Sequence, residues 1–529
     1  MANEILIKGG LVVDGTGAEG RKADVAVRDG QIVAVGQNIS AGDGRVIDAG
    51  DKVVAPGFID IKTHSDWTLP LMPLSESKIR QGVTTEVIGH CGFSCAPVLP
   101  GKAAALAEYL GPSAPWLDFV DTSFADYVRT YPATSVNRVM LVGHNTLRLM
   151  TMGLEDRPPE PDELDHMKRL LEDALAAGAY GMSSGLFTAP GSYSEGEELV
   201  ELGQILKARG APYFTHLRDE SNGVFDAVAE AIKFGERTGV HVQIVHLKLS
   251  GLDNWDGAGR LLETFDAARA RGVAIDADLY PYTAASNPLK NLMPPWLQEG
   301  GVGAMLGRLG EPEIRARIKD EIGRTGLNNF GRIPSWDAIR ISISPNQQHY
   351  GGRTMTDIAT ERGADPFDTV LDYIVEDRGQ TRVLVDSISE DDVRTFIASP
   401  SVLFGSDGNS VAPYGTTGQG MPHPRFYGTF ARILGQYVRD LGLLPLEHAI
   451  HKMTGASAAA LGITDRGQVR EGWAADLTVF DPATIAERAT FDDPHQFADG
   501  VSQVIVNGEI VLDDGEHTGA TPGRALARH

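Results

Sequence analysis

Five apolar runs along this chain each lead into a side chain that hydrolytic enzymes use. These side chains are, in order, Cys91, His216, His246, Tyr280 and Asp407. Two imidazoles and one thiolate form a borderline-soft set of ligands that suits zinc and leaves a fourth position open for water. Asp407 could accept a proton from that water and pass it to a leaving nitrogen. The residue types therefore predict one zinc held by Cys91, His216 and His246, with Asp407 as the catalytic base and acid.

Each of these residues, taken alone, also has an ordinary structural explanation. A histidine at a strand end is often a hydrogen-bonded structural residue, a buried cysteine is usually a small hydrophobic residue, and an aspartate before glycine often starts a turn. Five independent placements at strand ends are hard to attribute to chance, so the combination favours a site. The other cysteine, Cys95, lacks the second Cys pair of a zinc ribbon and is predicted to be a packed thiol.

A shared site requires strands whose ends meet. Apolar segments that alternate with helix-like segments indicate βαβ units, and they cover residues 57–63, 83–90, 138–144, 179–184, 212–217, 241–247, 273–280 and 402–407. Eight such strands close a barrel whose chemistry lies at the carboxyl ends of the strands. We therefore predict an α/β fold with a (β/α)8 TIM-like barrel over residues 56–284 and 346–469.

Two further units are predicted outside the barrel. Short alternating apolar runs with glycine turns at both ends of the chain predict one small β-sandwich domain built from both termini, residues 1–55 and 470–529. Between the seventh and eighth strands, residues 285–400 are too many for a structureless loop. We predict an inserted subdomain over residues 285–345, near the barrel mouth, with a short strand in residues 338–344.

The charge balance argues against several classes of partner. Lys and Arg total 47 and Asp and Glu total 71, which gives a formal net charge of −24 and argues against binding to nucleic acids or anionic membranes. A local Lys or Arg can still bind an anionic small molecule. No apolar stretch approaches the roughly 20 residues of a membrane span, and the first residues do not resemble a signal peptide. With two cysteines, the sequence predicts a cytoplasmic protein whose oligomeric state stays open.

Several motifs resemble those of the D-aminoacylase branch of the amidohydrolase superfamily. They are Gly89-His-Cys-Gly-Phe-Ser, Tyr213-Phe-Thr-His-Leu-Arg-Asp-Glu, Val245-His-Leu-Lys, Asp278-Leu-Tyr-Pro-Tyr, Gly405-Ser-Asp-Gly and His423-Pro-Arg-Phe-Tyr-Gly-Thr-Phe. The resemblance covers essentially the whole chain and implies hydrolysis of N-acyl-D-amino acids to a carboxylate and a free D-amino acid. It assigns the tight zinc to Cys91, His216 and His246 and catalysis to Asp407. It also implies substrate contacts at Lys248, Tyr280, Ser286, Arg425 and Tyr193.

The chain departs from this family in the stretch Asp60-Ile-Lys-Thr-His. Lys62 stands where the family has the first histidine of Asp-x-His-x-His, a pair that helps to hold a second, weaker metal. His64 remains as a weak or second-site ligand. One interpretation is that the Lys62 ammonium takes the place of the dispensable metal and leaves activity intact. The other is that the chain has changed its substrate or lost its activity.

Two other functions stay open. Cyclic-amide hydrolases of the hydantoinase or dihydroorotase kind share the barrel, but they usually bridge two metals with a carboxylated lysine after the fourth strand. Here that strand ends Gly181-Met-Ser-Ser-Gly, without a lysine. A non-catalytic amidohydrolase homologue is favoured slightly by Lys62 and disfavoured by the joint presence of the three ligands and Asp407. The number of bound metals, one, two or none, separates the three functions.

Overall fold

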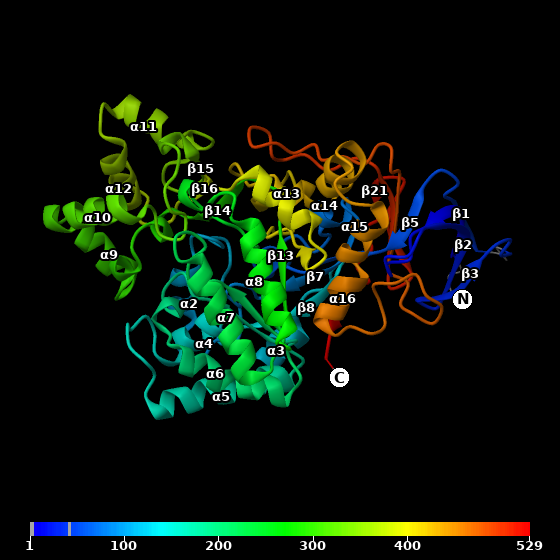
Figure 1. Ribbon diagram of the computed structural model, residues 1–529, viewed down its shortest axis with the longest axis horizontal. Helices are drawn as coiled ribbons and strands as arrows, with labels where there is room; N and C mark the ends of the chain where they lie inside the picture. Colours follow the sequence, from blue (N-terminus) through cyan, green and yellow to red (C-terminus); the bar gives the residue numbers. More distant parts are fainter. Residues whose placement is uncertain (1–4, 41–43, 529) are drawn as a thin grey trace.

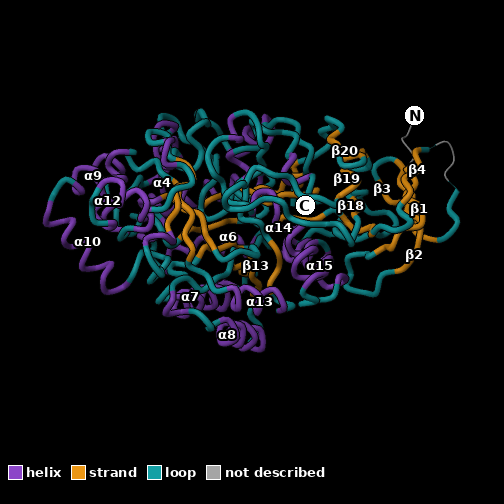
Figure 2. Tube along the Cα trace, turned by 90° about the horizontal axis from the view of Figure 1, so that it is seen from above, coloured by secondary structure: helices purple, strands orange, loops and turns teal. Residues whose placement is uncertain are grey.

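The computed structural model describes residues 5–40 and 44–528 of the 529-residue chain. Strands and helices alternate through its middle, from β6 (Phe58–Asp60) to α16 (Gly455–Leu461). Figure 1 shows strands from the chain ends on one side of this middle, and helices α9 (Gly301–Leu309) to α12 (Pro366–Glu376) on the other side. Figure 2 shows the same arrangement from a second direction. The predicted end domain includes residues 1–4, 41–43 and 529, which lie outside the described residues.

The parallel strands of the middle, together with β22 from near the end of the chain, form two sheets. Their bounds are β6, β7 (Val83–Ile88), β8 (Asn137–Met140), β9 (Val142–Gly143), β10 (Met182–Gly185), β11 (Tyr213–His216), β12 (Val242–Ile244), β13 (Ile275–Leu279), β17 (Val402–Phe404) and β22 (Ala525–Leu526). The strand orders are β17-β13-β12-β11-β10-β9 and β22-β8-β7-β6. Only Leu141 separates β8 from β9, and a parallel bridge between Thr63 and Gly408 joins the segments that follow β6 and β17. Each of the eight predicted strand segments overlaps one of these strands, and the α/β class with parallel sheets is confirmed.

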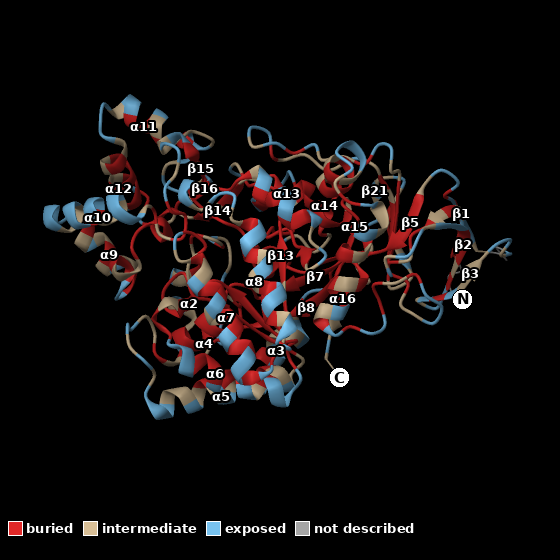
Figure 3. Cartoon of the chain, in the orientation of Figure 1, coloured by how far each residue is buried: buried red, intermediate tan, exposed pale blue. Residues whose placement is uncertain are grey.

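Helices pack against these strands and bury them. All four residues of β11 are buried, and Figure 3 shows buried strands beneath helices whose outer faces are exposed. Parallel strands covered in this way read as continuous apolar runs, which is why the sequence revealed them. The connecting helices are α4 (His144–Thr151), α5 (Pro161–Ala176), α6 (Gly196–Ala208), α7 (Val224–Thr238), α8 (Ala258–Ala270), α13 (Glu390–Ala398), α14 (Arg425–Arg432) and α15 (Leu446–Met453). Helix α7 is followed directly by Gly239, whose left-handed φ of 66° suits a helix stop.

Strands from both ends of the chain share one nine-stranded sheet. Its order is β21-β20-β19-β18-β5-β1-β2-β3, with β4 paired to β1. The bounds are β1 (Ile5–Val12), β2 (Arg21–Arg28), β3 (Gln31–Gly36), β4 (Arg45–Asp48), β5 (Val53–Pro56), β18 (Leu477–Phe480), β19 (Val501–Val506), β20 (Glu509–Asp513) and β21 (Glu516–His517). The two halves join where β5 pairs antiparallel with β18. Further along the chain, β22 belongs to a different sheet, where it pairs in parallel with β8.

A third sheet lies between β13 and β17 in the sequence. It contains β14 (Ala284–Pro288), β15 (Ile339–Ile343) and β16 (Arg382–Asp386), in the antiparallel order β14-β16-β15. The predicted short strand in residues 338–344 is therefore present as β15. Its partner β16 comes from beyond residue 345, so strand pairing ties the predicted insertion to a later part of the chain. Helices α9, α10 (Pro312–Thr325), α11 (Met355–Arg362) and α12 accompany this sheet.

Long apolar helices are absent from the described residues. None of the helices within residues 5–40 and 44–528 combines the length and the hydropathy needed to cross a membrane.

Candidate metal centre and active site

The three predicted zinc ligands meet at the carboxyl ends of three strands. Cys91 lies just beyond β7, His216 is the last residue of β11, and His246 lies just beyond β12. All three side chains are buried, and their ligand atoms lie within 4.8 Å of one another. The Sγ of Cys91 is 3.3 Å from Nε2 of His246. The arrangement puts the three side chains within reach of a single ion.

Hydrogen bonding leaves one nitrogen of each histidine free for an ion. His246 directs Nδ1 to Oε1 of Glu220, 3.0 Å away, and Nε2 toward Cys91. Nε2 of His216 lies 3.2 Å from Nδ2 of Asn329 and 3.4 Å from Oε2 of Glu220, while its buried Nδ1 has no hydrogen-bond partner. A carboxylate on the far nitrogen fixes the ring orientation and tautomer of a metal-binding histidine. Both rings are therefore held in the orientation that an ion would require.

Glu220, the last residue of the motif that begins at Tyr213, received no role from the sequence. Besides both histidines, its carboxylate accepts hydrogen bonds from Nζ of Lys248 at 2.6 Å and from Nδ2 of Asn329 at 3.0 Å. Burial opposes its charge, but the Lys248 ammonium and the two histidines outweigh burial and hold the pKa of Glu220 well below its usual value. The motif marks this position, but an acidic residue in a loop has no evident role from the sequence alone. Only the tertiary structure brings this carboxylate against both rings.

The protonation states of the cluster suit a divalent metal. Burial, followed by the charge of Lys248, lowers the pKa of His246 to about 3, and burial also lowers the pKa of His216. Both imidazoles are therefore neutral at pH 7, as metal ligation requires. Burial raises the pKa of the Cys91 thiol to about 12, so a bound cation is needed to keep it as a thiolate. Two neutral imidazoles and a thiolate match the preferences of zinc.

Asp407 lies in a cluster of cationic side chains. One carboxylate oxygen, Oδ1, accepts a short hydrogen bond from Lys62 and lies 3.4 Å from Nε2 of His64. The other, Oδ2, is 2.9 Å from Nη2 of Arg425. Burial opposes the charge of Asp407, but Arg425 and Lys62 outweigh burial and hold its pKa well below the usual value. Asp407 is therefore an anion at neutral pH.

Lys62 contacts the histidine that the sequence assigned to a weak metal position. Its Nζ lies 2.7 Å from Nε2 of His64, and the side chain is completely buried. Burial favours the neutral amine, yet attraction to Asp407 and Cys91 outweighs burial and raises the pKa of Lys62. Lys62 therefore carries a positive charge directly against Nε2 of His64.

Backbone strain marks the same residues. Cys91, His246 and Asp407 have left-handed φ values of 55°, 39° and 50°. Such conformations cost roughly 1–3 kcal/mol each and cluster at functional sites. Close packing adds a second constraint, because a Cβ on Gly405 would lie 2.6 Å from Cβ of Lys62. Glycine at position 405 thus lets the strand that carries Asp407 pass close to Lys62.

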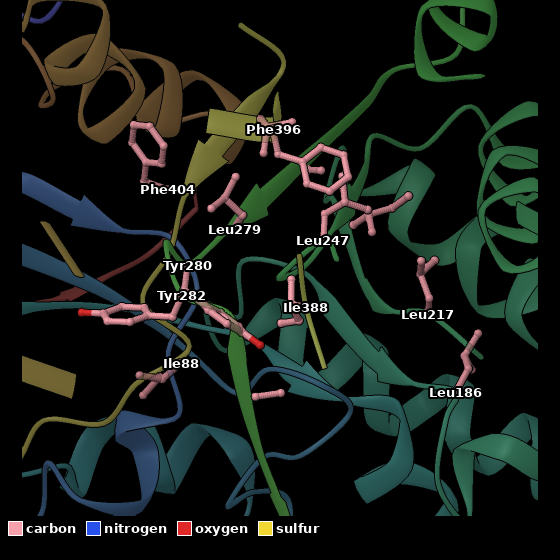
Figure 4. Close-up of a cluster of buried hydrophobic side chains, with 14 of the residues drawn as sticks. Ile88, Leu186, Leu217, Leu247, Leu279, Tyr280, Tyr282, Ile388, Phe396 and Phe404 are labelled. Carbon is pink, nitrogen blue, oxygen red and sulfur yellow. The ribbon is translucent and has the colours of Figure 1, made fainter. Parts of the chain in front are cut away.

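A buried ion pair fixes the segment that carries Asp407. Nζ of Lys78 lies 2.8 Å from Oδ2 of Asp60 and 2.6 Å from Oγ of Ser406. The backbone N–H of Ser406 donates to Oδ1 of Asp60 at 2.8 Å. These bonds tie the end of β6 to the residue before Asp407. Apolar side chains from the ends of neighbouring strands, among them Leu186, Leu217, Leu247 and Leu279, support the site from one buried cluster (Figure 4).

A small cavity of about 70 Å³ opens onto these groups. Its wall includes the three clustered ligands, Asp407, Ser286 and Arg425. Arg382 also lines it, donating from Nη2 to Oγ of Ser286 at 3.2 Å. Burial lowers the pKa of Arg382 to about 10, which still leaves the guanidinium charged at neutral pH. Reasoning from the sequence missed Arg382, because an arginine inside a strand gives no functional signal.

The remaining predicted substrate contacts lie behind or beside the cavity. Lys248, Tyr280 and Tyr193 are buried and are not among the residues of its wall. The ring of Tyr280 packs 4.5 Å from the Arg425 guanidinium, and its hydroxyl has no hydrogen-bond partner. The hydroxyl of Tyr193 is also buried without a partner. The cavity thus contains two of the five predicted contacts, Ser286 and Arg425.

Comparison with known proteins agrees with this geometry. The profile of the family described as "Amidohydrolase family" matches residues 45–512. D-aminoacylase of Alcaligenes xylosoxydans xylosoxydans is 37% identical over 535 residues, covering 99% of this chain and 98% of that protein. N-acyl-D-glutamate deacylase from Bordetella bronchiseptica, solved with zinc and a phosphonate mimic of the tetrahedral intermediate, has a TM-score of 0.83 and 33% identity over 100% of both chains.

A third similar structure concerns the metal content directly. It is a D-aminoacylase structure with a TM-score of 0.83 and 36% identity, covering 99% of both chains. That work describes a binuclear metal centre with activation by one metal and attenuation by the second. The family resemblance seen in the motifs is therefore confirmed: the chain belongs to the amidohydrolase family, in the branch of the D-aminoacylases and the N-acyl-D-amino-acid deacylases.

Proposed function

We propose that this protein is a zinc-dependent hydrolase that cleaves the amide bond of N-acyl-D-amino acids to a carboxylate and a free D-amino acid. The observation that carries the proposal is the meeting of Cys91, His216 and His246 in a cavity that also contains Asp407. Full-length similarity to D-aminoacylase and to N-acyl-D-glutamate deacylase supports the substrate class.

The proposed mechanism assigns a separate task to each group. Zinc, when bound by Cys91, His216 and His246, would polarise the amide carbonyl and lower the pKa of a water molecule. Asp407 accepts the proton of the attacking water and delivers it to the departing nitrogen. Its two oxygens offer about four acceptor positions, so contacts with Lys62 and Arg425 still leave room for that proton.

The substrate carboxylate needs a cationic partner within the cavity. Arg382, Arg425 and Ser286 all line the wall. The guanidinium of Arg382 donates a hydrogen bond to the hydroxyl of Ser286. A guanidinium matches a carboxylate with two parallel hydrogen bonds, which a lysine cannot do. We infer that Arg382 and Ser286 bind the α-carboxylate, and that Arg425, which already pairs with Asp407, adds positive charge. Lys248 pairs with Glu220 and thereby supports the histidines from behind the cavity wall. Tyr280 supports Arg425 in the same way, by packing its ring against the guanidinium.

We further propose that the chain holds one tight zinc only. The Lys62 ammonium lies 2.7 Å from Nε2 of His64 and bonds to Asp407, so it stands where a second cation would bind these two groups. A permanent ammonium would protect this chain from the attenuation by a second metal described for a D-aminoacylase. Lys62 is thus compatible with catalysis, and the intact ligand cluster speaks against a non-catalytic homologue.

The predicted domains fit the strand pairing. The bridge between Thr63 and Gly408 supports closure of the parallel strands into a (β/α)8 barrel over residues 56–284 and 346–469. The nine-stranded sheet supports a β-sandwich domain from residues 1–55 and 470–529, and β15 supports an inserted subdomain at residues 285–345. The two free, buried cysteines support a cytoplasmic location. The net charge of −24 supports a small-molecule substrate rather than a nucleic acid.

A test of this function compares enantiomers under controlled zinc loading. After removal of metal with a chelator, the protein should be inactive, and one equivalent of zinc should restore activity. N-acetyl-D-amino acids should be hydrolysed and their L-enantiomers should not, because binding the α-carboxylate turns the L-amide away from the clustered ligands. Equal rates for the two series, or full activity without metal, would refute the proposal.

A further inference from the structure

His423 is a completely buried histidine that lies outside the wall of the active-site cavity. Its Nδ1 accepts a hydrogen bond from the backbone N–H of Arg425 at 3.0 Å, and its Nε2 donates to the backbone carbonyl of Ala284 at 2.9 Å. Arg425 is the first residue of α14, and Ala284 is the first residue of β14. One imidazole therefore joins the start of a helix to the start of a strand that lies far away in the sequence.

Both nitrogens of His423 are used in a single tautomer. Burial, followed by the charge of Arg425, holds the pKa of His423 well below its usual value, so the ring is neutral at pH 7. A neutral imidazole offers one donor and one acceptor. Here Nε2 carries the hydrogen for the Ala284 carbonyl, and Nδ1 keeps its lone pair for the Arg425 N–H. Neither asparagine nor glutamine can supply both bonds, because each presents its donor and its acceptor on a single carbon.

Aromatic rings hold the imidazole of His423 in place. The ring centroids of Tyr282 and Phe491 each lie 5.0 Å from that of His423, in edge-to-face arrangements. The Tyr282 hydroxyl donates to Oε1 of Glu487 at 2.5 Å. Phe491 and Glu487 both belong to the connection between β18 and β19. The sheet built from both chain ends therefore helps to fix His423 through this connection.

Each end of this bridge leads to a group of the proposed mechanism. At one end, Nη2 of Arg425 lies 2.9 Å from Oδ2 of Asp407. At the other end, β14 carries Ser286 two residues after Ala284, and the Ser286 hydroxyl accepts a hydrogen bond from Arg382. The spacing between the catalytic base and the groups assigned to the α-carboxylate therefore depends on how β14 lies against α14.

We propose that His423 is a positioning residue that sets the place of the substrate α-carboxylate relative to Asp407. The inference rests on the proposed function, in which Ser286 and Arg382 bind that carboxylate. Because β14 is an edge strand of its sheet, strand pairing holds only one of its sides, and the bond from His423 adds a second attachment. Without this bridge, β14 and α14 shift relative to each other. The bound carboxylate then no longer places the amide correctly against the clustered ligands and Asp407.

The test compares two variants that each keep one of the two bonds. His423→Asn retains an acceptor for the Arg425 N–H, and His423→Gln retains a donor for the Ala284 carbonyl. The probes are the N-acetyl-D-amino acid that the zinc-loaded wild type hydrolyses best and its own α-carboxamide. The KM of the acid should rise about 10- to 100-fold, because a displacement of about 1 Å can cost about 10²-fold. The carboxamide lacks the carboxylate, so its Ki as a competitive inhibitor, or its KM if it is hydrolysed, should stay unchanged.

Thr429→Val is the matched control. It removes a buried hydrogen bond of 2.9 Å from Oγ1 of Thr429 to the Arg425 carbonyl, a bond within α14 that does not reach β14, and it should change neither constant. A selective rise in the KM of the acid in either His423 variant supports the proposal, so one variant decides the question if the other does not fold. If neither variant raises that KM, or if the constants of acid and carboxamide rise by the same factor, the positioning role is wrong while the deacylase function stands.

The control and the wild type supply the remaining outcomes. An equal, selective rise in Thr429→Val would attribute the effect to α14 as a whole and overturn the assignment to His423. If the zinc-loaded wild type hydrolyses no N-acyl-D-amino acid, the proposed function and the role of His423 are both wrong.

Discussion

Replacement of Lys62 by histidine tests whether an ammonium stands in for a second metal. A metal on His64 would lie about 2.1 Å from Nε2. Since Nζ of Lys62 is 2.7 Å from the same atom, metal and ammonium would be no more than about 4.8 Å apart. At an effective dielectric constant of about 20, a divalent ion and an ammonium at that distance repel by about 7 kcal/mol.

Deprotonation of Lys62 would be the cheaper route to a second metal. Starting from an ordinary lysine pKa of about 10.4, neutralisation at pH 7 costs about 4.6 kcal/mol. This figure is a lower limit, because Asp407 and Cys91 outweigh burial and raise the pKa of Lys62. Since about 1.4 kcal/mol corresponds to a tenfold change, the second position should bind metal at least about 10³-fold more weakly than without the ammonium.

The assay is a zinc titration followed by elemental analysis and kcat at each zinc level. The wild-type protein should stay at one zinc per chain with constant activity, whereas Lys62→His should approach two zinc ions and lose activity as zinc rises. Lys62→Met removes the charge without adding a ligand and so separates repulsion from ligation. Two tightly bound zinc ions in the wild type would refute the electrostatic argument. A Lys62→His variant that gains no metal and is inactive would make Lys62 a catalytic residue.

Three further substitutions test the base, the carboxylate beside the ligands and a buried ion pair. Asp407→Asn should keep its zinc and lose about 10²- to 10⁴-fold in kcat, as expected for removal of a general base; a loss below tenfold would place the base elsewhere. Glu220→Gln should weaken zinc binding about 10- to 100-fold in competition with a chelator, because it removes the charge that orients both imidazoles; unchanged affinity would contradict that role. Glu198→Gln should lower the free energy of unfolding at pH 7 by about 3–5 kcal/mol, because it leaves the buried guanidinium of Arg148 without its counter-charge. Burial opposes ionisation of Glu198, but contacts with His144 and Arg148 outweigh burial and lower the pKa of Glu198. The carboxylate therefore stabilises the fold at pH values above the unfolded pKa of about 4.3. This stabilisation is lost as the pH falls through the folded pKa. The difference in Tm between the wild type and Glu198→Gln should therefore shrink below about pH 4.3, and an undiminished difference at pH 3 would contradict the argument.

The ligand cluster was predictable because strand ends are visible in a sequence. Apolar runs that end in Cys91, His216 and His246 mark strands buried on both faces, and the carboxyl ends of parallel strands meet on one side of a barrel. Knowledge of the strand ends therefore sufficed to bring three distant residues together. The same reasoning identified Asp407 after β17, whereas the unusual position of Lys62 after β6 was recognised from the resemblance to the family motif.

Residues outside those strand ends were not predictable in this way. Arg382 reaches Ser286 only because β16 pairs antiparallel with β14, and nothing local in either segment specifies that partner. Lys290 follows β14 as an ordinary lysine, and only the tertiary structure shows that it is largely buried at the wall of the cavity. Glu220 lies in a loop whose path is decided by contacts with Asn329, more than one hundred positions away.

The sequence by itself determined the family, the strands of the parallel sheets, the types of residue at their ends and the replacement of a histidine by Lys62. The strands follow from local pattern, because strands buried on both faces read as continuous apolar runs. The family and the replacement at Lys62 follow from the motifs. Only the tertiary structure decided that Lys62 bonds to both His64 and Asp407, that Glu220 orients both imidazoles, and that Arg382 and Lys290 face the cavity. These contacts join segments far apart in the chain, and their geometry depends on packing and desolvation that no local pattern encodes.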